Sequence, residues 1–380
     1  MEYTCKTEKV LSGFHKREVS LIAFSRGEDS SDQCYLASIG QDENHSICIY
    51  NYKKGNMVAN AKGDKNKVFA IEFVYGKFKS NLTIVQCGVN HVRVWTMNGR
   101  NLASKKVPFG KGVGLDTCLS LSPVNRYMLI GGASGNIYQI LFDESNKKPG
   151  KVKKVEVLKQ KGGDGKGDNA HGPINSIYAN YKKNAVVTGC VKGIVKVFKF
   201  DKGPPEPNLE EKVIINNDWK ELEKGFKYNG WNVMKTSYKV PGKKKGKKKV
   251  PNKVIPVEKA NPQIRSVCLN KDCTKVLVGT RGSEIVEFGI DIENGKVHKG
   301  EGQMQIITRG HFKDEVWGLT IDKAKDSNMY FTSGDDGYIR LWNFKEEKQI
   351  ENFRLNSLGL KDPVMARSCA VSPGNIDAPR

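Results

Sequence analysis

Residues 330–343 read Tyr330-Phe-Thr-Ser-Gly-Asp-Asp-Gly-Tyr-Ile-Arg-Leu-Trp-Asn343. Two short apolar runs flank Gly334-Asp-Asp-Gly337, a cluster of turn-forming residues. Runs of this kind, bounded by glycine and aspartate, predict two antiparallel strands joined by a tight turn. The preceding run, Val316-Trp-Gly-Leu-Thr-Ile321, alternates with a period of two and adds a third strand. This part of the chain is therefore predicted to form one small antiparallel sheet.

The same three-strand unit occurs six times along the chain. In each unit the second strand ends at a glycine, and the third strand carries a β-branched residue three positions before an aromatic or apolar one. The glycines are Gly40, Gly88, Gly132, Gly189, Gly279 and Gly334, and the third strands close at Tyr50, Trp95, Ile140, Phe198, Phe288 and Trp342. Successive closing residues are 45, 45, 58, 90 and 54 positions apart, and the shortest spacings match a four-stranded propeller blade of about 40–45 residues. We therefore predict an all-β propeller over residues 1–374 with six recognisable four-stranded blades and the start of a seventh at Arg367-Ser-Cys-Ala-Val-Ser-Pro373, followed by a tail over 375–380.

Composition narrows the function classes. The chain of 380 residues carries 63 Lys and Arg against 41 Asp and Glu, a formal charge of +22, which favours polyanionic partners. Its nine cysteines are scattered, mostly within apolar runs, which predicts reduced core thiols in a soluble cytoplasmic protein. No apolar run approaches the length of a membrane span, so no membrane partner is expected. We found no nucleophile motif, paired-carboxylate motif or metal-ligand spacing, so catalytic, metal and cofactor sites are all predicted to be none.

A lysine-rich insertion separates the fourth and fifth units, over residues 201–262. Between Lys202 and Lys259 it holds 15 lysines and seven acidic residues. Its densest run comprises Lys243, Lys244, Lys245, Lys247, Lys248 and Lys249. Six like charges this close repel one another, so the run is predicted to be disordered and solvent-facing, although the aromatic residues between Trp219 and Tyr238 could pack on the propeller.

These lysines are the candidate partner-binding residues, together with a second basic run that contains Lys151, Lys153 and Lys154. Two interpretations remain open. The runs either bind an acidic protein surface or nucleic-acid phosphate directly, or they are solvated loops with no partner.

The sixth unit resembles a WD repeat, through Gly310-His311 and the Leu-Trp-Asn ending of residues 341–343. In that family a histidine, a serine or threonine, an aspartate and the tryptophan form a hydrogen-bonded tetrad. The resemblance assigns His311, Ser333 or Thr332, Asp336 and Trp342 to this structural tetrad. Asn44, Val89, Ser134, Lys192 and Gly282 stand where we place the equivalents of Asp336, so the tetrad is expected in the sixth unit alone.

Longer phrases resemble the echinoderm microtubule-associated protein-like family of atypical tandem propellers. They include Gln86-Cys-Gly-Val-Asn-His-Val-Arg-Val-Trp95 and Gly310-His-Phe-Lys-Asp-Glu-Val-Trp-Gly-Leu319. The resemblance covers about residues 13 to 374, the N-terminal propeller of the family, without counterparts of its first blade and second propeller. We therefore expect a fragment or a short divergent member.

The resemblance implies a non-enzymatic cytoskeletal scaffold that binds microtubules or tubulin, whose acidic surface suits a basic propeller. The implied location is cytoplasmic and cytoskeletal, with a ciliary axoneme as a variant of it. The alternatives are a nucleic-acid-binding or ribosome-associated propeller that uses the same lysines on phosphate, which is less favoured, and a general protein-protein interaction scaffold.

Overall fold

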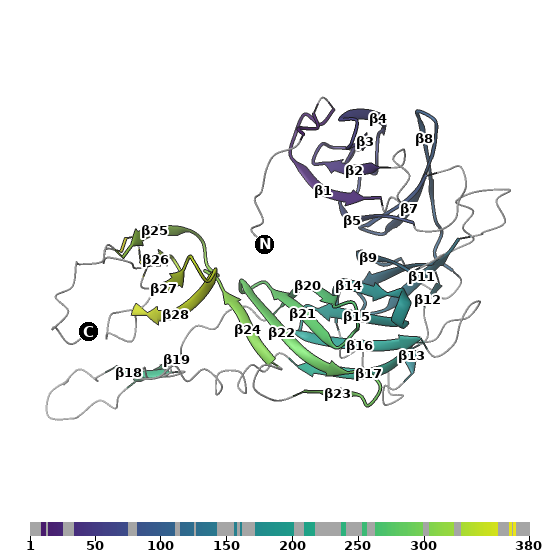
Figure 1. Cartoon of the computed structure of the whole chain (residues 1–380). Coiled ribbons are helices and arrows are strands. Elements are labelled where there is room, and N and C mark those ends of the chain that lie inside the picture. Colours follow the sequence, from purple (N-terminus) through teal and green to yellow (C-terminus); the bar gives the residue numbers. More distant parts are fainter. Residues whose placement is uncertain are drawn as a thin grey trace, which may run out of the picture. The chain divides into compact units, whose positions relative to one another are not determined.

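The computed structural model describes residues 9–12, 14–25, 34–74, 82–110, 115–124, 127–142, 156–157, 160–161, 172–200, 209–216, 237–240, 253–256, 263–298, 304–322, 328–355, 365–366 and 368–369. These residues form six successive sheets, which we call blades 1 to 6 and which are labelled by strand in Figure 1; all their strand pairs are antiparallel except β13 with β17. The predicted fold class, an all-β propeller of WD type, is confirmed.

The strands follow one another along the chain, and most blades contain four of them. Blade 1 consists of β1 (Val19–Phe24), β2 (Tyr35–Gly40), β3 (Ile47–Asn51) and β4 (Asn56–Ala61). Blade 2 consists of β5 (Val68–Phe73), β6 (Leu82–Gly88), β7 (His91–Asn98) and β8 (Asn101–Lys106). Blade 3 consists of β9 (Cys118–Val124), β10 (Tyr127–Gly132), β11 (Ile137–Leu141) and β12 (Glu156–Val157).

Blades 4 to 6 repeat the pattern with additions. Blade 4 consists of β14 (Ile174–Asn180), β15 (Ala185–Cys190), β16 (Ile194–Phe200) and β17 (Leu209–Asn216), with β13 (Gln160–Lys161) beside β17 and the 3-10 turn η1 (Tyr181–Lys183) between β14 and β15. Blade 5 consists of β20 (Ile264–Leu269), β21 (Lys275–Thr280), β22 (Glu284–Asp291), β23 (Lys296–Val297) and β24 (Met304–Arg309). Blade 6 consists of β25 (Val316–Ile321), β26 (Met329–Gly334), β27 (Tyr338–Asn343) and β28 (Lys348–Arg354). A separate hairpin joins β18 (Ser237–Val240) to β19 (Lys253–Pro256).

The chain divides into two units. The first comprises Met1–Asn216, Ile264–Val276 and Ile290–Val297, and the second comprises Asn217–Gln263, Leu277–Gly289 and His298–Arg380. Blades 1 to 4 belong to the first unit and blade 6 to the second, whereas β21 and β22 of blade 5 contribute residues to both.

In the first unit the hydrophobic core lies between neighbouring blades. Ile39 and Ile49 of blade 1 pack with Phe73 and Trp95 of blade 2, and equivalent clusters join blade 2 to blade 3 and blade 3 to blade 4. A central strand is therefore covered on both faces, and every residue of β10 and β15 is buried. Continuous apolar runs in the sequence reflect this double burial.

The outer strands have the opposite character. Five of the six residues of β8 are exposed, and its sequence is mostly polar. Strand β17 takes the place of the fourth strand in blade 4, because it pairs antiparallel with β16 along its length, and β13 lies on its other side. The predicted insertion over residues 201–262 was therefore placed too early: Leu209–Asn216 completes blade 4. Four of the six second strands end at the predicted glycine, whereas β15 ends at Cys190 and β21 at Thr280, one residue beyond it.

Buried thiols fill several of these interfaces. All eight described cysteines are free, and six of them are buried. Burial, followed by the charge of Asp116, raises the pKa of Cys118 to about 12, so this thiol stays protonated at neutral pH. Six of the described cysteines are thus core residues, as predicted from their apolar neighbours.

Candidate functional site

Blade 6 contains a chain of partly buried hydrogen bonds. The indole Nε1 of Trp342 donates to Thr332 Oγ1 over 2.8 Å, and this hydroxyl lies 3.0 Å from Nε2 of His311. The other imidazole nitrogen, Nδ1, lies 2.9 Å from a carboxylate oxygen of Asp336. Nδ1 also lies 2.6 Å from Arg340 Nη1, so this nitrogen contacts both the carboxylate and the guanidinium. The chain links the turn after β26 to the core of the blade.

A buried arginine completes the network. Arg340 Nη1 lies 2.9 Å from Asp336 Oδ2, and both side chains are almost fully buried. Arg340 Nε also donates to the carbonyl of Arg309 over 2.8 Å. Burial alone would raise the pKa of Asp336, but the hydrogen bond from His311 and the charge of Arg340 outweigh it and lower this pKa. Asp336 is therefore an ionised carboxylate whose charge is compensated inside the blade.

The hydroxyl in this network belongs to Thr332. Ser333 is fully buried, and its Oγ has no hydrogen-bond partner among the described residues. A Cβ at Gly318 would lie 2.2 Å from that oxygen, so Ser333 faces the first strand of the blade instead. Of the two hydroxyls that the resemblance left open, the network therefore contains Thr332 and not Ser333, because neighbouring residues of a strand point to opposite faces.

Blade 1 holds a related network that the sequence analysis missed. His15 Nε2 lies 2.7 Å from Ser38 Oγ, and Ser46 Oγ bonds both His15 and Asp42. Both Gly40 and Gly334 end the second strand of their blade, so Asp42, two residues later, is the equivalent of Asp336. Counting two residues from the glycine that ends the second strand would have identified Asp42 from the sequence. The choice of Asn44 as the equivalent of Asp336 is therefore wrong, although Tyr50 stands in blade 1 where the tetrad of blade 6 has Trp342.

Blade 3 anchors its turn with an aspartate from another position. Asp116, just before β9, accepts hydrogen bonds from Ser134 Oγ at 2.6 Å and from Tyr138 OH at 2.7 Å. We expected Ser134 at the position equivalent to Asp336. Ser134 is instead hydrogen-bonded to Asp116, an aspartate in the connection that precedes β9. No signal within the turn itself indicates this partner.

In blade 2 the tryptophan bonds a different side chain. Trp95 Nε1 donates to Gln86 Oε1 over 2.9 Å, and Gln86 Nε2 lies 3.4 Å from Nε2 of His91. His91 Nδ1 in turn donates to the carbonyl of Val89 over 3.1 Å. Burial is the main reason that the pKa of His91 is lowered. The neutral imidazole is thus the form that fits this buried site.

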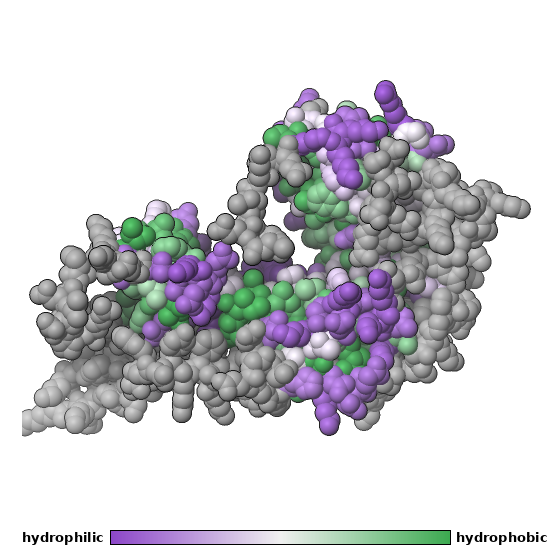
Figure 2. All heavy atoms as spheres, viewed as in Figure 1, coloured by the Kyte–Doolittle hydropathy of each residue, from purple (hydrophilic) through white to green (hydrophobic). Residues whose placement is uncertain are grey.

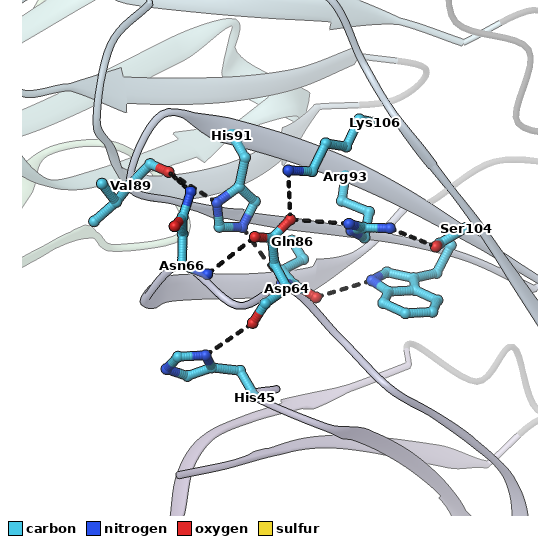
Figure 3. Close-up of polar contacts among 10 residues, drawn as sticks. His45, Asp64, Asn66, Gln86, Val89, His91, Arg93, Ser104 and Lys106 are labelled. Carbon is cyan, nitrogen blue, oxygen red and sulfur yellow. Dashed lines mark hydrogen bonds and ion pairs between the residues drawn. The ribbon is translucent and has the colours of Figure 1, made fainter. Parts of the chain in front are cut away.

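A second cluster of blade 2 surrounds Asp64, in the connection from β4 to β5, and is drawn in Figure 3. One carboxylate oxygen lies 2.9 Å from Arg93 Nη2 and 2.9 Å from Lys106 Nζ. Asp64 itself is only 4% exposed. Burial would raise the pKa of Asp64, but the hydrogen bonds from Arg93 and Lys106 outweigh it and hold that pKa far below its usual range. This cluster was also missed, because the three residues lie up to 42 positions apart.

Comparisons with known proteins bear on what these blades belong to. Residues 302–343 match the family model described as "WD domain, G-beta repeat". Echinoderm microtubule-associated protein-like 4 of Xenopus laevis is 27% identical over 146 residues, 38% of this chain and 15% of the relative. Echinoderm microtubule-associated protein-like 1 of Homo sapiens is 30% identical over 127 residues, 33% of this chain and 15% of the relative. The 77 kDa echinoderm microtubule-associated protein of Strongylocentrotus purpuratus is 20% identical over 352 residues, 92% of this chain and 39% of the relative.

This chain is similar to the echinoderm microtubule-associated protein-like proteins, and it contains a WD repeat. The alignments span 15% to 39% of the length of the three relatives. The blade-6 network has the arrangement that the WD resemblance implied, with Thr332 as its hydroxyl residue. The WD match covers β24 of blade 5 and β25 to β27 of blade 6, and so includes His311, Thr332, Asp336 and Trp342.

The lysines predicted to bind partners of this WD-repeat protein lie outside the described residues. They are Lys151, Lys153, Lys154, Lys243, Lys244, Lys245, Lys247, Lys248 and Lys249. Within the described ranges, no group of three or more histidine, cysteine, aspartate and glutamate residues could hold a metal ion. The same residues contain no helix long and apolar enough to cross a bilayer. The described polar clusters instead fix loops at the ends of the blades.

Proposed function

We propose that this chain is a non-enzymatic scaffold of the cytoskeleton that binds microtubules or tubulin through basic surfaces of its propeller and its lysine-rich run. The observation that carries the proposal is the similarity to relatives named as microtubule-associated proteins, which extends over 92% of this chain in the sea-urchin protein. A formal charge of +22 supports it, because an acidic partner would attract such a chain over several ångströms at physiological salt.

Structure contributes a rigid framework to this proposal. In the first unit, the buried networks of blades 1 to 3 hold the loops at one end of the strands in place. Loops on a rigid sheet framework are the usual positions of binding residues. A scaffold that docks onto a repetitive polymer needs this rigidity, because ordering its loops on binding would cost affinity.

Pelleting with microtubules across a salt series tests the proposal. We expect the intact chain to pellet at low salt and to be released as salt rises, since exposed charges are screened. Replacing the six lysines between Lys243 and Lys249 by glutamine is expected to lower the fraction that pellets. Microtubules from which the acidic tubulin tails have been removed should retain less of the chain. Failure of the intact chain to pellet at low salt, with RNA retained through purification instead, would contradict the proposal and favour a nucleic-acid partner.

A further inference from the structure

The connection between β4 and β5, residues 62–67, has an unusual distribution of charge. We call it the Asp64 loop. Its three lysines, Lys62, Lys65 and Lys67, are exposed, whereas its single acid is buried. Lys106, which ends β8 and pairs with Asp64, is 55% exposed. The loop therefore presents positive charge to solvent and keeps its negative charge inside.

Hydrogen bonds hold the backbone of the Asp64 loop from both sides. His45 Nδ1 donates to the carbonyl of Asp64 over 2.9 Å, and the amide of Asn66 donates to the carboxylate of Asp64 over 3.0 Å. The side chain of Asn66 bonds the carbonyl of Val89 over 3.3 Å, and the amide of Val89 bonds the carbonyl of Lys67 over 3.0 Å. Figure 3 shows Asp64 and Asn66 between His45 on one side and Val89 on the other.

Close approach at Gly63 adds to this restraint. A Cβ at Gly63 would lie 2.1 Å from the carbonyl oxygen of His45, so no larger residue fits there without movement of the backbone. Contacts also hold two of the ammonium groups in place. Lys106 contacts Asp64, and Lys67 Nζ lies 5.6 Å from the centre of the Phe69 ring. The ammonium groups are thus carried on a backbone that is ordered before any partner binds.

We propose that the Asp64 loop and Lys106 form a preorganised docking platform for an acidic polypeptide segment rich in glutamate or aspartate. Four exposed ammonium groups around one short loop suit a cluster of side-chain carboxylates. Surfaces that bind single-stranded nucleic acid combine a basic track with aromatic rings on which bases stack. The Asp64 loop has no aromatic residue, and the neighbouring Phe69 is partly buried beneath Lys67. The proposal rests on the proposed function for the identity of the acidic partner.

Binding of a labelled oligoglutamate peptide to the full chain, measured by fluorescence anisotropy across a salt series, tests the platform. Changing Lys62, Lys65 and Lys67 together to glutamine is expected to weaken binding about tenfold or more. The matched control changes Lys53, Lys54 and Arg100 to glutamine. These exposed residues lie in turns at the opposite ends of the strands of blades 1 and 2, so the control removes the same charge and should change affinity less than about twofold.

Asp64→Asn separates a built platform from simple charge attraction. This change makes the chain more positive, so charge alone would tighten peptide binding. The platform predicts weaker binding, because Lys106 loses its partner and the Asp64 loop loses its anchor. Asn66→Ala, which leaves the charge unchanged and removes the contact with Val89, should weaken binding in the same direction and serves if Asp64→Asn fails to fold.

Four outcomes would overturn the inference. The first is an equal loss of peptide affinity in the Lys62, Lys65 and Lys67 variant and in its Lys53, Lys54 and Arg100 control. The second is tighter peptide binding by Asp64→Asn, and the third is unchanged binding by Asn66→Ala. The fourth is a single-stranded RNA that binds the Lys62, Lys65 and Lys67 set more tightly than the peptide does. Microtubule pelleting without peptide binding would also reject the platform and leave the proposed function standing. Peptide binding at the platform without microtubule pelleting would reject the proposed function alone.

Discussion

Thr332 and Ser333 are adjacent residues with the same hydroxyl group and opposite surroundings. Thr332 Oγ1 joins Trp342 to His311, whereas the buried Ser333 Oγ has no partner among the described residues. Removing a hydroxyl that hydrogen-bonds two other groups inside the blade is costly, because each of those groups stays shielded from water and has lost its hydrogen-bond partner. A hydroxyl without a partner contributes no such stabilisation.

Thr332→Val should therefore destabilise the protein by about 2–4 kcal/mol, because it leaves Trp342 Nε1 and His311 Nε2 unpaired in the blade. Ser333→Ala is the matched control, and we expect a change of less than about 1 kcal/mol from it. Chemical denaturation followed by tryptophan fluorescence measures both values. A larger loss from Ser333→Ala than from Thr332→Val would contradict the assignment of the tetrad.

His91 makes stability depend on pH within blade 2. Its folded pKa is lowered, chiefly by burial, so between that value and the ordinary pKa of about 6.5 the unfolded chain binds a proton that the folded chain does not. Stability is therefore fully present above about pH 6.5 and falls as the pH is lowered through this range. His91→Gln should lose less stability than the native chain between about pH 7.5 and 5.5, measured by urea midpoints. His298→Gln changes an exposed histidine and should follow the native curve; equal slopes in both variants would refute the prediction.

At the scale of the element, the outer strands carry the least sequence signal and still complete the blades. Strand β17 pairs with both β16 and β13, although it was assigned to the insertion. The outermost strand of a blade faces no neighbouring core along most of its length, as β4 and β8 show by their exposure. An outermost strand therefore needs no alternating apolar pattern. For this reason the sequence pattern revealed three strands in each unit, although the blades contain four or more.

Two deletions test the corrected boundary of blade 4. Replacing residues 217–262 with a glycine-serine linker keeps β17 and β20, so the melting temperature should stay close to that of the intact chain. Replacing residues 201–262 removes β17 and its ladder to β16, at about 0.5–1.5 kcal/mol per hydrogen bond, and the melting temperature should fall markedly. Thermal unfolding monitored by circular dichroism measures both. Equal destabilisation by the two deletions would show that β17 does not stabilise blade 4.

At the scale of the whole molecule, the apolar residues of the first and last blades are unevenly covered. Ile22 and Phe24 of β1 are 59% and 53% exposed, and Figure 2 shows hydrophobic residues at the surface beside this strand. Leu319 and Ile321 in β25 of blade 6 are 71% and 59% exposed. On another face of the same blade, Ala366 bonds the carbonyl of Gly334 and Cys369 Sγ contacts the carbonyl of Phe331. Of the segment predicted to begin a seventh blade, Arg367–Pro373, the structure describes residues 368–369. Cys369 contacts blade 6, and these two residues form no strand.

The amino-acid sequence alone determined the all-β class, the six repeating units and the family resemblance, because central strands buried on both faces and glycine-ended turns leave a periodic signal. It also located the blade-6 tetrad to within one residue. Tertiary structure alone decided that Thr332 faces inward, that β17 completes blade 4, and that Asp64 meets Arg93 and Lys106. Pairing between distant strands sets these contacts. Residues that meet across such a pairing have no fixed separation in the sequence, so no sequence pattern identifies them.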